Sequence, residues 1–104
     1  MGQGAILSLA LPDGKPRLID WPALKTIWRE QEGKTVRADI LVRPEDVLAD
    51  ADGISCKVDS VLYEGERYAL RLSLPDGQTL RAHSREVMKA GDVYAVAIRS
   101  AWRL

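Results

Sequence analysis

The residues best suited to binding an anion are four arginines on either side of a predicted turn. They are Arg67, Arg71, Arg81 and Arg85. A three-residue loop over 75–77 pairs Leu72 with Leu80, the register that keeps the apolar residues of both strands on one face. The same register places Arg71 opposite Arg81, and Arg67 opposite Arg85, on the other face. This face is either simply solvated or a surface that binds an anion or an acidic partner. The second interpretation rests on the geometry of guanidinium groups, which matches carboxylates and phosphates.

Few other residues are suited to catalysis or to binding a metal or a nucleotide. The chain has one cysteine, Cys56, and one histidine, His83. Alternating apolar neighbours predict that Cys56 lies in the core, whereas His83 is expected on the strand surface opposite Ala69. With one His and one Cys, a zinc site would need carboxylates for its other ligands, and the sequence has no GxxxxGK[ST] phosphate loop. We therefore expect a domain that is not an enzyme and holds no metal or cofactor.

The composition predicts one small soluble domain over residues 1–104. Hydrophobic residues make up 46% of the 104 residues, and the formal net charge is zero. Zero net charge gives no long-range attraction for nucleic acid. No apolar run is long enough to insert into a bilayer. A single cysteine fits a reducing compartment such as the cytoplasm.

The elements that must position these residues are mostly strands. An N-terminal hairpin is expected from strands over 5–11 and 17–19, and its Leu-Pro-Asp-Gly end resembles the later turn over 74–77. One helix is predicted over 21–31, with Asp20 as its N-cap, Pro22 in its first turn and Gly33 after its end. Its apolar face consists of Trp21, Leu24, Ile27 and Trp28.

The rest of the chain predicts a barrel or sandwich of short strands. The alternation over 36–42 indicates a strand that ends before Pro44. A polar, acidic loop is expected over 49–53. Further strands are expected at 54–63, 67–74, 78–84 and 92–99. The predicted fold class is mainly β, an OB-like small barrel with one short helix.

Several short motifs occur in a characteristic order between residues 36 and 99. They are Arg43-Pro44-Glu45, the strand ending Tyr63-Glu64-Gly65, the turn at Asp76-Gly77 and the strand start at Gly91-Asp92. In this order and spacing they resemble the transport-associated OB (TOBE) domain at the C-terminus of ATP-binding subunits of bacterial ABC importers, of the maltose, polyamine and ferric iron type. The helix over 21–31 and the ending at 101–104 depart from the usual pattern of the family.

The resemblance implies an accessory or regulatory domain that joins two copies of the ATP-binding subunit. It implies that ATP and magnesium bind to an upstream ATPase domain, and that the full protein contacts the membrane subunits of the transporter. The expected location is cytoplasmic, at the inner face of the bacterial plasma membrane. Two alternatives remain open: a domain that binds a small oxyanion, and an OB barrel that binds nucleic acid.

Overall fold

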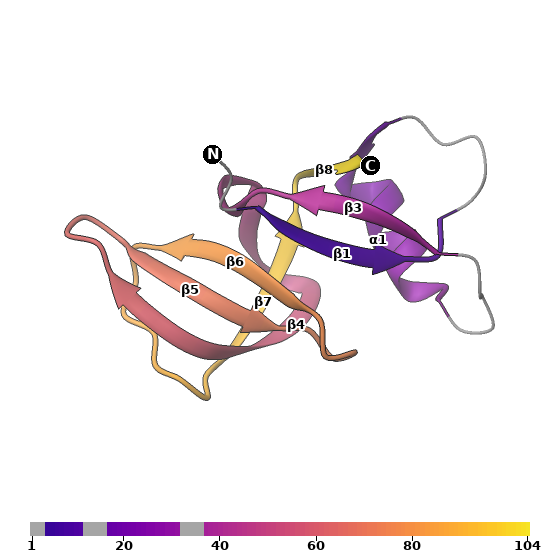
Figure 1. The fold of residues 1–104 in the computed structure, drawn as a ribbon. Coiled ribbons are helices and arrows are strands. Elements are labelled where there is room, and N and C mark those ends of the chain that lie inside the picture. The colour runs from indigo at the N-terminus through magenta and orange to yellow at the C-terminus, as the bar shows by residue number, and fades with distance from the viewer. Residues whose placement is uncertain (1–3, 12–16, 32–36) are drawn as a thin grey trace.

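The computed structural model describes residues 4–11, 17–31 and 37–104. This part of the chain forms two four-stranded antiparallel sheets and one helix (Figure 1). The elements are β1 Ala5–Leu9, β2 Leu18–Asp20, α1 Trp21–Arg29, β3 Ala38–Val42, the 3₁₀ turn η1 Pro44–Asp46, β4 Val47–Tyr63, β5 Tyr68–Ser73, β6 Thr79–Ser84, β7 Val93–Ile98 and β8 Ser100–Arg103. The strand orders are β1-β3-β8-β2 and β6-β5-β4-β7. The mainly β, OB-like fold is therefore confirmed.

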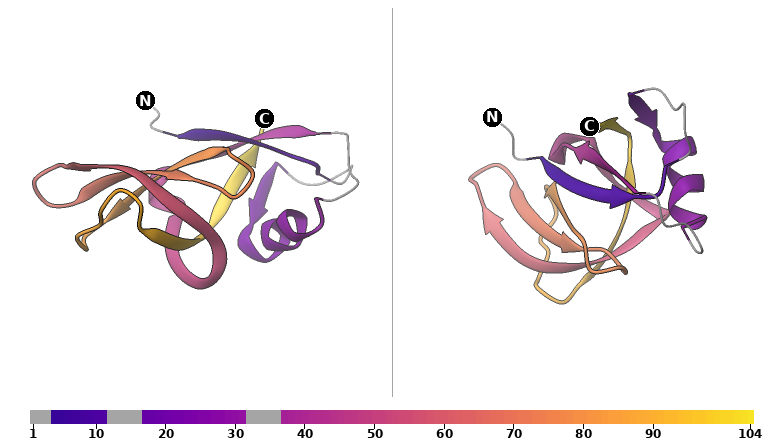
Figure 2. Two further views of the ribbon diagram at one scale, coloured as in Figure 1. Left: turned by 90° about the horizontal axis from the view of Figure 1, so that it is seen from below. Right: turned by 45° about the vertical axis from the view of Figure 1, so that its right-hand side comes forward.

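The chain crosses between the two sheets at two places. The η1 turn leads from β3 in the first sheet to β4 in the second, and β7 leads back to β8 in the first. β4 follows a strongly curved course, and α1 lies at the far end of the molecule from the β4–β5 hairpin (Figure 2). The buried apolar side chains of both sheets and of α1 belong to one core cluster.

Helix α1 begins where the sequence predicts. The Asp20 carboxylate accepts a hydrogen bond of 3.2 Å from the Ala23 N–H, and Pro22 lies in the first turn, where no N–H is needed. Leu24 and Ile27 are buried, while Trp21 and Trp28 are partly buried against the core. The helix ends at Arg29, and Gly33 lies outside the described residues. Among the described residues, no helix has the length and apolarity needed to cross a membrane.

The predicted N-terminal hairpin is wrong. Its two strands form, but β1 pairs with β3 and β2 pairs with β8. No strand is predicted at β8, which provides β2 with a partner. Ala101 of β8 is buried beside Ile19, so this pairing continues the core face across the sheet. Turn residues favour a local reversal of the chain, but long-range burial decides which strands pair.

The second hairpin has the predicted register. Leu72 is aligned with Leu80 and Arg71 with Arg81. The loop closes through hydrogen bonds from Leu74 N–H to Gln78 O and from Gly77 N–H to Leu74 O. Gly77 has a φ of 91°, a conformation that side chains with a Cβ rarely adopt. The prediction holds because a one-residue slip would turn the leucines out of the core, and the three-residue loop selects among the registers that remain.

The acidic loop predicted over 49–53 is also wrong, because these residues belong to β4. Ala49 and Ile54 are both aligned with Val96 of β7, so the intervening residues form a bulge. Polar composition indicated a loop, but a bulge also turns its extra residues towards solvent. Gly53 sits at the end of the bulge, and a Cβ at this position would lie 2.0 Å from the Val96 carbonyl oxygen. The bulge therefore depends on the missing side chain.

Two glutamine side chains bind the edge of β1 that faces away from β3. Gln78 accepts a hydrogen bond of 2.6 Å from the Ser8 N–H and donates one of 3.0 Å to the Ser8 carbonyl. Gln31 bonds in the same way to the N–H and the carbonyl of Ala10, at 2.9 and 3.1 Å. Each amide thus occupies the donor and acceptor that a neighbouring strand would use. These contacts also connect β1 to the second sheet and to the end of α1.

Cys56 lies in the core, as the sequence predicts. Burial raises the pKa of its thiol to about 11. Because the thiolate is the reactive form, iodoacetamide at about pH 8 should leave the folded chain unlabelled and should label it in urea. Mass spectrometry measures both reactions. Labelling of the folded chain at the rate of a free thiol would show that the strand around Cys56 opens readily.

Candidate functional site

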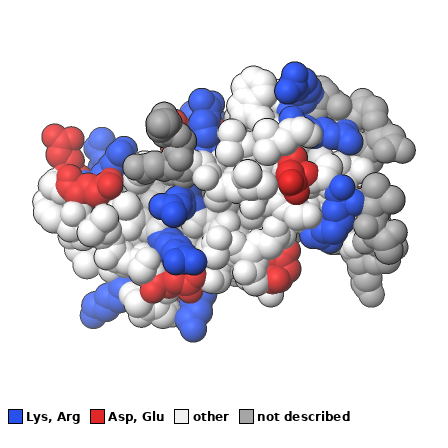
Figure 3. Space-filling view, viewed as in Figure 1, with Lys and Arg blue, Asp and Glu red and all other residues white. Residues whose placement is uncertain are grey.

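The four arginines considered as one face fall into two pairs. Arg67 and Arg85 line a hollow together with Glu64 and Glu66 at the tip of the β4–β5 hairpin. Arg67 Nε lies 3.3 Å from Glu64 Oε1. Carboxylates therefore accompany this pair. Basic and acidic side chains alternate over the surface seen in Figure 3, which shows no single large basic patch.

Arg71 and Arg81 form the second pair, at the middle of the outer face of the second sheet. Strand register places Ser60, Arg71 and Arg81 in one row across β4, β5 and β6. Both arginines are exposed, and among the described residues neither forms an ion pair. Like charges directly opposite one another destabilise a sheet slightly. The pair is therefore available to an anionic group from outside.

A second row lies beside the arginines and is mainly apolar. It consists of Leu62, Ala69 and His83 on the same three strands. Leu62 is 65% exposed, whereas the His83 side chain is largely covered and has its Nε2 4.0 Å from Glu64 Oε1. His83 is thus less exposed than its strand position predicts. The two rows border a hollow of about 260 Å³, which Pro44 of η1 also lines.

The outer face of the first sheet carries an apolar row that crosses all four strands. In strand order the row is Ile6, Leu41, Trp102 and Leu18. Ile6 is 59% exposed, Trp102 41% and Leu18 47%, while Leu41 is partly buried. Single exposed apolar residues are ordinary, but a contiguous set of this kind indicates a surface that contacts another molecule.

Charged residues of opposite sign flank this apolar row. Asp39 of β3 lies two residues before Leu41, and Arg43, in extended conformation directly after β3, lies two residues after it. Residues two apart on a strand share a face, so both side chains stand beside the row, one on each side. The Arg43 side chain is half exposed, and Asp39 is exposed. The surface therefore has a negative and a positive border.

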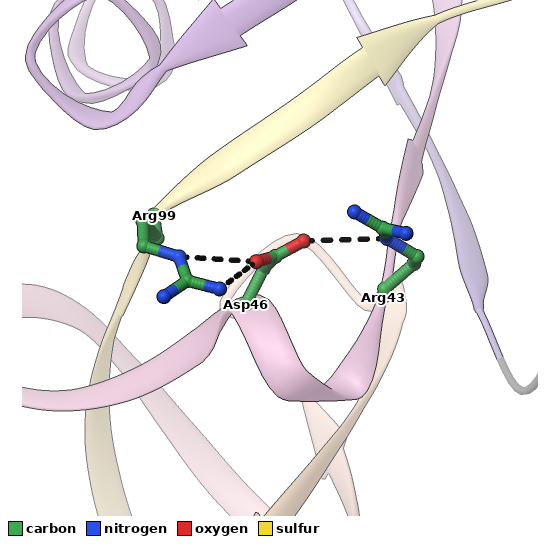
Figure 4. Close-up of polar contacts among 3 residues, drawn as sticks. All are labelled: Arg43, Asp46 and Arg99. Atoms are coloured by element: carbon green, nitrogen blue, oxygen red, sulfur yellow. Dashed lines mark hydrogen bonds and ion pairs between the residues drawn. The ribbon is translucent and has the colours of Figure 1, made fainter.

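A buried carboxylate fixes the two crossings between the sheets. Asp46, in η1, is 2% exposed and lies between Arg43 and Arg99 (Figure 4). Its Oδ1 accepts hydrogen bonds of 2.7 and 3.2 Å from Arg99, and its Oδ2 lies 3.5 Å from Arg43 Nε. The Arg99 N–H also donates to the Asp46 carbonyl at 2.7 Å. The aspartate thus connects the β3–β4 turn to the β7–β8 turn.

The remaining motif residues are in turns. Gly65, Gly77 and Gly91 have φ values of 92, 91 and 96°. Asp76 accepts a hydrogen bond from the Gln78 N–H, and Asp92 accepts one from the Lys89 N–H. Pro44 begins η1, and Glu45 next to it is exposed. These motif residues shape the chain.

Sequence reasoning missed the apolar row and the role of Asp46. The row becomes visible only when β8 is known, because Trp102 connects the residues of β3 and β2. By its type alone, Asp46 resembles the other acidic residues between Glu45 and Asp52. Its position two residues after Pro44 and directly before an apolar strand was the only local signal.

Comparison with known families adds one match. A family model described as the TOBE domain matches residues 40–102, which is more than half of the chain. The matched region begins within β3 and runs through the second sheet into β8. It therefore contains the Arg71–Arg81 pair, Asp46 with both its arginines, and Trp102. No curated protein sequence matches the chain.

Proposed function

Because the chain belongs to the TOBE domain family, we propose that it is the accessory domain of the ATP-binding subunit of a bacterial ABC importer, and that it joins two copies of that subunit. The family match over residues 40–102 carries this proposal. ATP and magnesium would bind to the ATPase domain of the full subunit, which would lie at the inner face of the plasma membrane against the transporter's membrane subunits. This domain would contribute contacts between subunits and no catalysis.

The apolar row supports the contact with a second copy. Sheets that pack face to face bury apolar rows between them at a separation of about 10 Å. The row crosses four strands, and adjacent strands lie about 4.8 Å apart, so it spans roughly 15 Å. Ile6, Trp102 and Leu18 would each remove further apolar surface from water in such a contact.

Charge complementarity favours one two-fold arrangement. Consider a two-fold axis that runs along the apolar row, midway between the first sheets of the two copies. It places each residue of the row opposite the same residue of the second copy. The same axis exchanges the two borders of the row, so Asp39 faces Arg43 of the second copy, and the contact occurs twice. A two-fold axis in the same plane but perpendicular to the row places Asp39 opposite Leu104 of the second copy instead. The proposed interface therefore has matched apolar centres and matched charges.

Trp102→Glu should separate the two copies. Two-fold symmetry places both substituted residues close together, so one change buries two unpaired carboxylates in the contact. We expect the dimer dissociation constant of the chain to rise by about 100-fold or more. Sedimentation equilibrium over a range of protein concentrations measures this constant. Trp102 is partly exposed in one copy, so the far-ultraviolet circular dichroism should stay unchanged.

Val93→Glu is the matched control, because Val93 is exposed on β7, away from the apolar row. It should leave the dimer constant within about twofold. Asp39→Lys should weaken the dimer if the axis lies along the row and should have little effect if it is perpendicular. A chain that stays monomeric at every concentration with Trp102 intact would argue against the proposal. Association that survives Trp102→Glu would place the contact elsewhere.

A further inference from the structure

The Arg71–Arg81 hollow has a shape and charge pattern that the contact between subunits does not use. It lies on the outer face of the second sheet, whereas the apolar row lies on the first. Three donors border it in one row: the two guanidinium groups and the Ser60 hydroxyl. An anion that lies between or above the two facing arginines would relieve the repulsion between them.

Acidic side chains on both sides of the row formed by Ser60, Arg71 and Arg81 limit the anion to one small group. Glu64 lies next to His83 on one side, and Asp59 accepts a hydrogen bond from Ser73 in the row beyond Arg71. A polyanion that followed the sheet would meet these carboxylates. A single carboxylate over Arg71 and Arg81 would not extend to them. The charges therefore disfavour a nucleic acid and favour an isolated acidic side chain.

The apolar neighbour indicates what else the ligand must carry. Leu62 is 65% exposed and lies two residues from Ser60 on β4, which is about 6.6 Å along the strand. An inorganic anion has no group that covers this leucine. An extended peptide does, because side chains two residues apart lie on one face at the same spacing. A carboxylate and an apolar side chain at i and i+2 would contact the arginine row and Leu62 together.

We propose that this hollow binds an extended acidic segment of a partner protein, with one carboxylate held by Arg71 and Arg81 and an apolar side chain two residues away packed on Leu62. The Ser60 hydroxyl donates a further hydrogen bond to the carboxylate. The site is open to solvent, so the carboxylate contact alone is weak and salt-sensitive, and the apolar contact supplies the rest. No ATPase domain or second copy is needed for this binding.

The test uses the 104-residue chain and a fluorescent synthetic peptide that repeats Glu-Ser-Leu-Ser. Fluorescence anisotropy should show saturable binding that weakens as sodium chloride rises from about 50 mM to about 0.5 M. Replacing each glutamate of the peptide by glutamine should weaken binding and remove its dependence on salt. Arg81→Gln should weaken binding by about tenfold, and Arg71→Gln should do the same. Leu62→Ser should weaken it without changing its salt dependence.

Arg85→Gln is the matched control, because Arg85 is also exposed but lies with Glu64 and Glu66. It should leave the peptide affinity within about twofold. Equal losses from Arg85→Gln and Arg81→Gln would overturn the proposal, since general surface charge would then explain the binding. Competition by inorganic phosphate at micromolar concentration, with Leu62→Ser without effect, would also overturn it in favour of a small-oxyanion site. A monomeric Trp102→Glu chain should bind the peptide normally, so this proposal and the proposed function fail separately.

Discussion

Gly53→Ala should destabilise the folded chain by about 3 kcal/mol or more, because it inserts a methyl group into a contact between backbones. A Cβ on Gly53 would lie 2.0 Å from the Val96 carbonyl oxygen and 2.5 Å from the Val96 carbonyl carbon. Neither atom belongs to a flexible side chain, so the clash is relieved only if β4 moves away from β7. That movement breaks the hydrogen bonds on both sides of the bulge.

Urea denaturation followed by tryptophan fluorescence measures this loss. Gly65→Ala is the matched control, because Gly65 has a φ of 92° and a Cβ there would meet no atom within 4 Å. It tests backbone strain without a clash and should cost about 1–2 kcal/mol. If both variants lose the same stability, the close approach at Val96 carries no special cost. If Gly53→Ala is as stable as the parent chain, the bulge geometry described above is wrong.

Arg99→Met should cost about 2–3 kcal/mol, because it removes both hydrogen bonds to Asp46 Oδ1 and leaves a buried carboxylate whose remaining partner is the longer contact with Arg43. Among the described residues, no hydrogen bond reaches Oδ2, so the loss on Oδ1 is not made up on the other oxygen. Arg43→Met should cost about 1 kcal/mol or less, because its contact with Asp46 is an ion pair of 3.5 Å that makes no hydrogen bond.

The double variant Asp46→Leu/Arg99→Met isolates the cause. An apolar side chain of similar volume removes the buried charge, so the double variant should be more stable than Arg99→Met alone. Urea denaturation of the parent chain, of Asp46→Leu, of Arg99→Met and of the double variant gives the coupling free energy between the two residues. An additive result would show that Asp46 tolerates the loss of Arg99, and that the two crossings between the sheets are held together by backbone pairing alone.

The parts of the fold that the sequence predicts are those whose signals are local. Asp20 and Pro22 indicate the start of α1, Pro44 the end of β3, and the leucines around Gly77 the register of β5 and β6. In each case the residues that decide the structure are close together in the chain. The same holds for the pairing of Arg71 with Arg81, which follows from the hairpin alone.

The parts that escape prediction depend on residues distant in sequence. The pairing of β2 with β8 joins the first third of the chain to its last residues, and no turn residue specifies it. The bulge in β4 is defined by its alignment with Val96, and the ion pair of Asp46 by the position of Arg99. The apolar row had no signal of its own because it alternates with core residues on four separate strands. Its members are neighbours only after the sheet has formed.

The glutamine contacts on β1 have a consequence for the behaviour of the chain at high concentration. A strand whose N–H and carbonyl groups face solvent can seed the growth of fibrils by adding strands from other molecules. At Ser8 of β1 and at Ala10 directly after it, these groups are already bonded to the amides of Gln78 and Gln31. An incoming strand that paired along Ser8 and Ala10 would have to displace both amides first. These two side chains therefore act as a kinetic barrier to polymerisation, and the chain can associate through a sheet face without polymerising through a sheet edge.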